Sequence, residues 1–282
     1  MAAHVEYTAR NIDADLIFGR RPEARNDVQV DFTKGKPEDH MESMHKLDER
    51  HRVTIQDIRG QKSTFTLERN GFTYLSHVIP ELDRTSDEEC MKNIIIPKTE
   101  ELVRTLTGAT RTVTFAHRVR CFVADTAQLA NNRAPAHSVH SDFSAAGALH
   151  QLSAIIPDEN ERRTLLAGRV LIINVWRPLK TIQRDPLAVC DWDTVDVQKE
   201  SIPNRLMLPT GWNSLGRYVF SPKQRWCYLS GQRPDEPLIF TQFDSDQFDW
   251  GGVTVPHTAF VDPEYTESAA RESLEIKMFA FV

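Results

Sequence analysis

The sequence Val139-His140-Ser141-Asp142-Phe143 places an imidazole and a carboxylate two residues apart. In a β-strand the side chains of residues i and i+2 point to the same face, so both groups could bind one ion. With a second, distant histidine they would form a 2-His-1-carboxylate triad, which suits non-haem Fe(II) with open positions for oxygen chemistry. A solvated loop is the alternative, because so short a motif also arises by chance.

The third ligand is expected from a distant part of the chain, because such a triad closes across a barrel. His137 and His150 lie too close to the pair in sequence, and His117 precedes it inside a predicted strand. His257 is the only histidine downstream of His150, and its β-branched and aromatic neighbours are typical of a strand end. We therefore expect His257 to be the third ligand, with a purely structural histidine as the alternative.

The last twelve residues, Arg271 to Val282, alternate as a β-strand does. One face carries Leu274, Ile276, Met278 and Ala280, and the other carries Arg271, Ser273, Glu275 and Lys277. Arg271 and Ser273 could therefore hold one carboxylate together, the guanidinium through a bidentate bond and the hydroxyl through a second bond. Without the triad, a solvent-facing strand would explain the same pattern.

Together these residues resemble the Fe(II)/2-oxoglutarate-dependent oxygenases, whose core is a double-stranded β-helix, or jelly roll. In that superfamily a His-x-Asp pair and a distal histidine bind iron. An arginine beyond the distal histidine, commonly followed two residues later by serine, binds the far carboxylate of 2-oxoglutarate. The resemblance implies that His140, Asp142 and His257 bind Fe(II), and that Arg271 and Ser273 bind 2-oxoglutarate.

More narrowly, the chain is similar to the fungal hydroxylase/desaturase family of secondary-metabolite pathways, which is related to a cephalosporin methoxylase component and includes an endoperoxidase. Two departures stand out: Ser141-Asp142-Phe143 differs from many relatives, and Lys277 replaces an expected second arginine. The matching segments are Asn174 to Leu179, Asp185 to Asp191, Ser221-Pro222 with Arg225 to Tyr228, Pro234 to Glu236, His257 to Phe260, and Arg271 to Ser273.

The resemblance implies that O₂ is used to oxidise a C–H bond in a small, largely apolar natural product, such as a terpenoid, a meroterpenoid or an amino-acid-derived scaffold. The substrate, and the choice among hydroxylation, desaturation, ring formation and endoperoxidation, stay open. So do two other functions, a non-catalytic jelly-roll subunit that assists a related oxygenase and a zinc hydrolase with the same ligands. The resemblance also implies a homodimer.

The pattern along the chain favours a β-rich, mixed α/β fold, with a jelly-roll core and flanking helices. Residues 1–46 are expected to form an N-terminal arm with little core of its own, a candidate lid or exchange surface, and residues 47–282 a single oxygenase domain. Strands are expected at 53–58, 63–67, 72–75, 113–122, 169–176, 187–192, 217–220, 226–229, 238–243, 254–260 and 273–282. Helices are expected at 144–152 and 158–166, with two more opened by the Ser86 to Glu89 capping box and by Pro97, the second ending at Gly108.

Two further polar residues fall on predicted strands that lead to the site. Asn174 lies on an otherwise apolar face, where a satisfied core amide is favoured over a bond to the cosubstrate. Arg120 could bind a substrate carboxylate inside the barrel, although an ordinary ion pair explains it as well.

Composition excludes several classes of protein. A net charge of −6 with interspersed signs argues against a nucleic-acid partner. The absence of an apolar run long enough to cross a bilayer, and of a signal peptide, predicts a cytosolic protein. The 4 cysteines lack CxxC spacing, so we expect reduced thiols rather than disulfides or zinc ligands.

Overall fold

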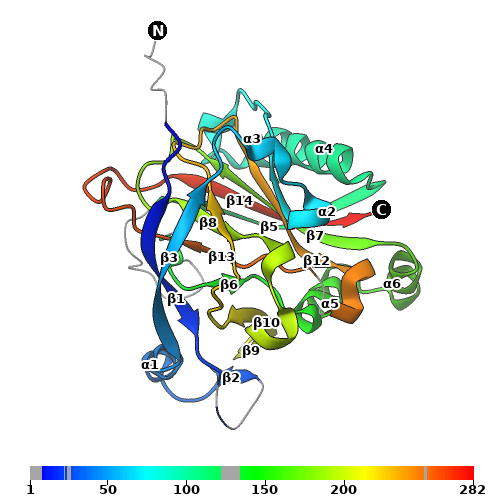
Figure 1. Cartoon of the computed structure of the whole chain (residues 1–282). Coiled ribbons are helices and arrows are strands. Elements are labelled where there is room, and N and C mark those ends of the chain that lie inside the picture. The colour runs from blue at the N-terminus through cyan, green and yellow to red at the C-terminus, as the bar shows by residue number, and fades with distance from the viewer. Residues whose placement is uncertain (1–7, 22, 24–26, 122–133, 251–252) are drawn as a thin grey trace.

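Two β-sheets that face each other form the centre of the computed structural model (Figure 1). The structure describes residues 8–21, 23, 27–121, 134–250 and 253–282. The larger sheet has the strand order β1 (Ile12–Gly19), β3 (Asp48–Asp57), β11 (Trp226–Tyr228), β8 (Leu187–Cys190), β13 (His257–Ala259), β6 (His140–Ser141), β10 (Gly211–Tyr218), β9 (Ser201–Leu208) and β2 (Val28–Asp31). The smaller sheet has the order β4 (Phe72–Tyr74), β12 (Leu238–Asp244), β7 (Val170–Pro178), β14 (Ser273–Phe281) and β5 (Arg111–Arg120).

The predicted β-rich jelly roll is confirmed by this arrangement. Most neighbouring strands are antiparallel, and only the β3–β11 and β2–β9 pairs of the described strands run parallel. β7 is buried along its whole length, because α4 (Ile96–Thr107) covers its outer face and its inner face packs against α5 (Ala145–Ile155) at one end and the larger sheet at the other. This explains its nearly continuous apolar sequence.

Helix α4 (Ile96–Thr107) covers the outer face of the smaller sheet (Figure 1). The expected two helices are one continuous run, because α3 (Glu88–Cys90) passes through a π-helical segment, Met91–Ile95, directly into α4. The first turn of an α-helix tolerates proline, which is where Pro97 lies. The N-cap is Asp87 instead of Ser86, since its carboxylate accepts the backbone N–H of Cys90. Gly108 ends α4 as predicted, with φ of 74°.

The remaining helices are short. The two predicted after the His-x-Asp pair are confirmed as α5 (Ala145–Ile155) and α6 (Glu159–Leu166), capped by Ser144 and Asp158. The others are α1 (Pro37–His45), α2 (Leu67–Asn70) and α7 (Val197–Glu200), with 3₁₀ turns at Lys62–Thr64, Leu82–Arg84, Trp192–Thr194 and Ser245–Trp250.

The strand expected at 63–67 is wrong. A 3₁₀ turn and α2 occupy this stretch, because the Thr66 hydroxyl accepts the backbone N–H of Arg69 and starts a helix. Gly71 has φ of 74° and ends α2. Strand β9 is not among the predicted strands, since it contains Pro203 and alternates weakly.

The expectation that the N-terminal arm has little core is wrong for β1. This strand pairs with β3 along all of its 8 residues and buries Ile12, Leu16 and Phe18. Its apolar residues alternate with polar ones in the manner of a half-buried strand, so the signal is present in the sequence. The domain boundary at residue 46 stays a prediction. No described helix is long and apolar enough to cross a membrane.

Candidate metal and cosubstrate site

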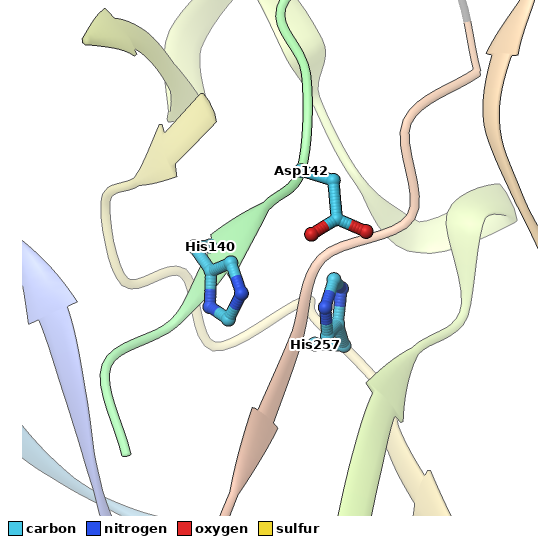
Figure 2. Close-up of side chains that lie close together, drawn as sticks. All are labelled: His140, Asp142 and His257. Carbon is cyan, nitrogen blue, oxygen red and sulfur yellow. The ribbon is translucent and has the colours of Figure 1, made fainter. Parts of the chain in front are cut away.

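The three predicted metal ligands lie together in the space between the sheets. Strands β6 and β13 are neighbours in the larger sheet, and His140 and His257 are direct cross-strand partners. Asp142 follows β6, and Figure 2 shows its carboxylate directed toward the two imidazole rings. One ligand atom from each residue lies within 4.8 Å of the others. This is the facial arrangement that the spacing of the motif predicts.

Backbone carbonyls orient both imidazole rings. Nδ1 of His140 lies 2.8 Å from the Ser138 oxygen, and Nδ1 of His257 lies 3.1 Å from the Val255 oxygen. Nδ1 must carry the proton to make these bonds, which leaves the lone pair of Nε2 for a metal ion. Burial, followed by the nearby His140, lowers the pKa of His257 to about 4, and burial also lowers the pKa of His140. Both rings are therefore neutral near pH 7, which is the form that binds metals.

Three side chains from the smaller sheet hold Asp142. Asn174 of β7 donates to Oδ2 at 3.0 Å, and Lys277 of β14 donates to Oδ1 at 2.6 Å. Gln242 of β12 accepts the backbone N–H of Asp142 at 2.6 Å. Burial alone would raise the pKa of Asp142, but the charge and hydrogen bond of Lys277, together with the two imidazoles, outweigh it and the net shift is downward. The carboxylate is thus kept ionised and fixed in orientation, as a metal ligand requires.

Gln242 also connects two of the predicted metal ligands. Its side-chain nitrogen donates at 3.0 Å to the Val255 carbonyl, the same oxygen that lies beside Nδ1 of His257. Gln242 occupies a β-bulge, since the pairing of β12 with β7 shifts between Thr241 and Phe243. Bulges re-aim side chains and are frequent beside active sites.

Arg271 and Ser273 form a buried group of hydrogen-bond donors that lack acceptors. Nη1 of Arg271 donates to the Asp185 carbonyl at 2.7 Å, but its Nε and the Ser273 hydroxyl have no partner among the described residues. The guanidinium lies 5.3 Å from the ring centroid of Trp176, whose indole N–H also has no partner within the described chain. Burial, followed by the charge of Arg120, lowers the pKa of Arg271 to about 10, so it stays cationic near pH 7. Unpaired buried donors are costly, and a carboxylate would satisfy them.

The two other polar residues singled out from the sequence have partners in the protein. Asn174 is a buried amide whose nitrogen donates to the predicted metal ligand Asp142, but its Oδ1 has no partner among the described residues, so the expected core amide is satisfied only in part. Arg120 donates to Glu275 at 2.6 Å and to the Ala134 carbonyl at 2.7 Å, which is the ion-pair alternative. A role for Arg120 in substrate binding stays a prediction.

Comparison with known proteins gives the site its chemical context. A family model described as "Oxidoreductase/YMDC permease-like domain" matches residues 16–281. The hydroxylase/desaturase efuI of Hormonema carpetanum is 31% identical, with 81% of this chain and 83% of the relative covered. The alpha-ketoglutarate-dependent dioxygenase phiK of Fungal sp. (strain ATCC 74256) is 29% identical, covering 98% of this chain and 94% of the relative.

A solved structure agrees with these matches. The iron and alpha-ketoglutarate-dependent endoperoxidase NvfI superposes with a TM-score of 0.78 at 25% identity, covering 96% of this chain and 98% of that chain. The chain belongs to the hydroxylase/desaturase family of Fe(II)/2-oxoglutarate-dependent dioxygenases. As a member of this family it is an oxidoreductase that uses Fe(II), 2-oxoglutarate and O₂.

Proposed function

We propose that His140, Asp142 and His257 bind the Fe(II), and that Arg271 and Ser273 bind the far carboxylate of 2-oxoglutarate. The observation that carries this proposal is the convergence of three metal-ligand atoms within 4.8 Å of one another. The unpaired buried donors of Arg271 and Ser273 support the second half, because they fit the carboxylate of a dicarboxylic cosubstrate.

The residues around the site place these groups and exclude water. Fe(II) with bound 2-oxoglutarate and O₂ supplies the oxidation of a C–H bond, with 2-oxoglutarate converted to succinate and CO₂. The protein keeps both imidazoles neutral, fixes the Asp142 carboxylate, and packs the Phe240 ring 4.9 Å from the His257 ring. Such prearranged, partly dry surroundings are the contribution that a protein makes to cofactor chemistry.

The substrate proposed is a small, largely apolar natural product of secondary metabolism, such as a terpenoid. Relatives named as hydroxylases/desaturases, an endoperoxidase and a gibberellin cluster GA4 desaturase support this class. Their names also cover several outcomes of C–H oxidation, so the same site chemistry is compatible with each of them.

The alternative of a non-catalytic partner subunit has no support among the relatives, which are named as enzymes. A zinc hydrolase is disfavoured because the donors of Arg271 and Ser273 would then have no ligand to bind.

The test is an anaerobic titration of the protein with Fe(II) and then 2-oxoglutarate, followed by visible absorption. We expect a charge-transfer band that His140→Ala lacks, and succinate formation in the presence of O₂ and a substrate panel. A band of equal intensity in His140→Ala would contradict the assignment of the ligands. His45→Ala, at an exposed histidine outside the triad, serves as a control for general effects of substitution.

We further propose a cytosolic homodimer. The four cysteines are all free thiols, which is consistent with the reducing environment of the cytosol.

The dimer is tested by light scattering coupled to size-exclusion chromatography, which measures the mass of the assembly. A monomer at all concentrations would contradict the dimer.

A further inference from the structure

Two cationic side chains, Lys277 and Arg118, share one face of the smaller sheet, and Lys277 contacts the predicted metal ligand Asp142 from that face. In the pairing of β14 with β5, Lys277 lies opposite Ala116 and Glu275 lies opposite Arg118. Directly opposed residues of antiparallel strands point to the same face, and diagonal neighbours lie within reach of long side chains. Arg118 is therefore a diagonal neighbour of Lys277 on the face that looks toward Asp142.

The acidic residue on this face is already neutralised. Glu275 pairs with Arg120 at 2.6 Å, and both side chains are nearly buried. Arg118 is exposed and makes no ion pair with any residue in the described part of the chain. The ammonium of Lys277 has three N–H donors, and its one hydrogen bond to a described residue goes to Asp142. Lys277 thus keeps donors without a described partner beside Asp142, and Arg118 adds a second cation on the same face.

Counting the charges of the site with Fe(II) and 2-oxoglutarate bound gives an excess of positive charge. Two positive charges of Fe(II) and one of Arg271 would be matched by Asp142 and by the two carboxylates of 2-oxoglutarate. The Arg120–Glu275 pair is neutral in sum. Lys277 would then share its counter-charge, Asp142, with the metal ion, and the exposed Arg118 has no counter-charge among the described residues. An incoming carboxylate would supply the missing negative charge.

The same two residues border a small hollow at the open edge of the sheet. The hollow has a volume of about 50 Å³ and is lined by Ala116, His117, Arg118, Glu275 and Lys277. Ala116, opposite Lys277, is small enough to leave room for a ligand group there. The Lys277 side chain keeps 19% of its surface exposed, so a group arriving from this edge can reach it.

We propose that Lys277 and Arg118 bind a carboxylate of the substrate, so that the substrate is an organic acid held by its acid end next to the metal centre. This inference rests on the proposed function of the site and adds to it the chemical class of the substrate. Because Lys277 contacts a metal ligand directly, the bond that is oxidised lies near the acid group and not at the far end of the molecule.

The experiment compares carboxylic acids with their uncharged methyl esters. Linear monocarboxylates from hexanoate to dodecanoate, and the corresponding esters, are titrated by calorimetry into the protein loaded with Fe(II) and 2-oxoglutarate in the absence of O₂. Monocarboxylates are chosen because they imitate 2-oxoglutarate poorly. We expect at least one acid to bind about tenfold to a hundredfold more tightly than its ester, the size expected for charge-assisted hydrogen bonds.

Substitutions of Lys277 and Arg118 test whether these two residues cause the preference for acids over esters. Lys277→Met and Arg118→Gln should each reduce the preference for the acid, and Lys277→Arg should retain most of it. Lys180→Met removes a lysine that is 72% exposed and paired with Glu272, and it should leave the preference unchanged. If Lys277→Met does not fold, Lys277→Arg and the exposed Arg118→Gln still decide the result.

Three outcomes would overturn the proposal: acids and esters that bind equally, a preference that survives both substitutions, or a Lys277→Met variant that needs more 2-oxoglutarate while it keeps the preference for acids. The last result would assign Lys277 to the cosubstrate. A wild-type protein without the charge-transfer band would instead contradict the proposed iron and 2-oxoglutarate site.

Discussion

Asn174 shows how a side chain that is not itself a predicted metal ligand can affect metal affinity. Its amide nitrogen bonds Oδ2 of Asp142 at 3.0 Å. We expect Asn174→Ala to weaken Fe(II) or Mn(II) binding by about tenfold to a hundredfold, because the carboxylate loses a partner that orients it. The measurement is an anaerobic metal titration. Asn204→Ala, at a buried asparagine in the larger sheet, should leave metal affinity unchanged, and an equal loss there would contradict this role.

Arg271 and Ser273 are expected to determine the affinity for 2-oxoglutarate. Arg271→Gln should raise the KM for 2-oxoglutarate by about a hundredfold, and Ser273→Ala by about tenfold, because charge-assisted bonds are roughly twice as strong as neutral ones. Arg177→Gln is the matched control, since this buried arginine of the same sheet donates to the backbone of His77 and Pro234. It should lower stability without raising the KM, and steady-state kinetics against 2-oxoglutarate separate the three variants.

At this scale the sequence predicts which residues come together at the candidate site, but it does not predict the residues that hold them in place. His140, Asp142 and His257 can be found because motif spacing and strand periodicity are local properties of the chain. Gln242 and Lys277 contact Asp142 from 100 and 135 residues away in the sequence. A local sequence pattern does not predict a contact between two facing sheets. In the sequence, only the presence of Lys277 in place of an expected arginine indicates that this position is unusual.

At the scale of elements, a buried carboxylate joins the end of β3 to the loop between β11 and β12. Glu236 is 1% exposed and bonds Arg59 through two nitrogens, at 3.2 and 3.0 Å, and Lys62 at 2.9 Å. Burial alone would raise the pKa of Glu236, but the hydrogen bonds and charges of Arg59 and Lys62 lower it from 4.5 to about 2.

This pKa shift predicts a pH-dependent contribution to stability. Between about pH 4.5 and 2 the unfolded chain binds more protons at this position than the folded one, so stability increases with pH across that window. The contribution, up to about 3 kcal/mol, is complete above about pH 4.5 and is lost as pH falls toward about 2. The difference in urea-unfolding free energy between wild type and Glu236→Gln should therefore shrink below about pH 4.5. A difference that is constant from about pH 7 to about pH 3 would contradict the assignment.

Elements are predictable where local periodicity and caps agree with the tertiary structure, as at α5, α6 and β14. The prediction at 63–67 failed because the Thr66 cap outweighs the β-forming side chains of this stretch. The two predicted helices are one because a π-helical segment carries the chain across the position where Pro97 suggests a new start. Both errors arise from backbone hydrogen bonding that residue periodicity does not report.

At the scale of the molecule, the metal site connects distant parts of the chain. His140 and His257 come from different strands, and Asp142 is held by the opposite sheet. A metal ion that binds only the folded state should stabilise it by about 2.7 kcal/mol at a concentration about one hundred times its Kd. Mn(II) should therefore raise the denaturation midpoint of the wild type, and Asp142→Ala should abolish this increase. An equal rise in the variant would show that the ion binds elsewhere.

The bulge at Gln242 places an amide beside the predicted metal ligands, although the strand pairing does not need this residue. On either side of this residue, Thr241 pairs with Ile173 and Phe243 pairs with Ile172, so removing Gln242 would leave a regular ladder with every other partner unchanged. We expect such a deletion to fold and to keep its jelly roll, yet to bind iron poorly, because Asp142 and the Val255 carbonyl would lose the amide that joins them. The extra residue therefore serves the contacts of the predicted metal site and not the pairing of the strand.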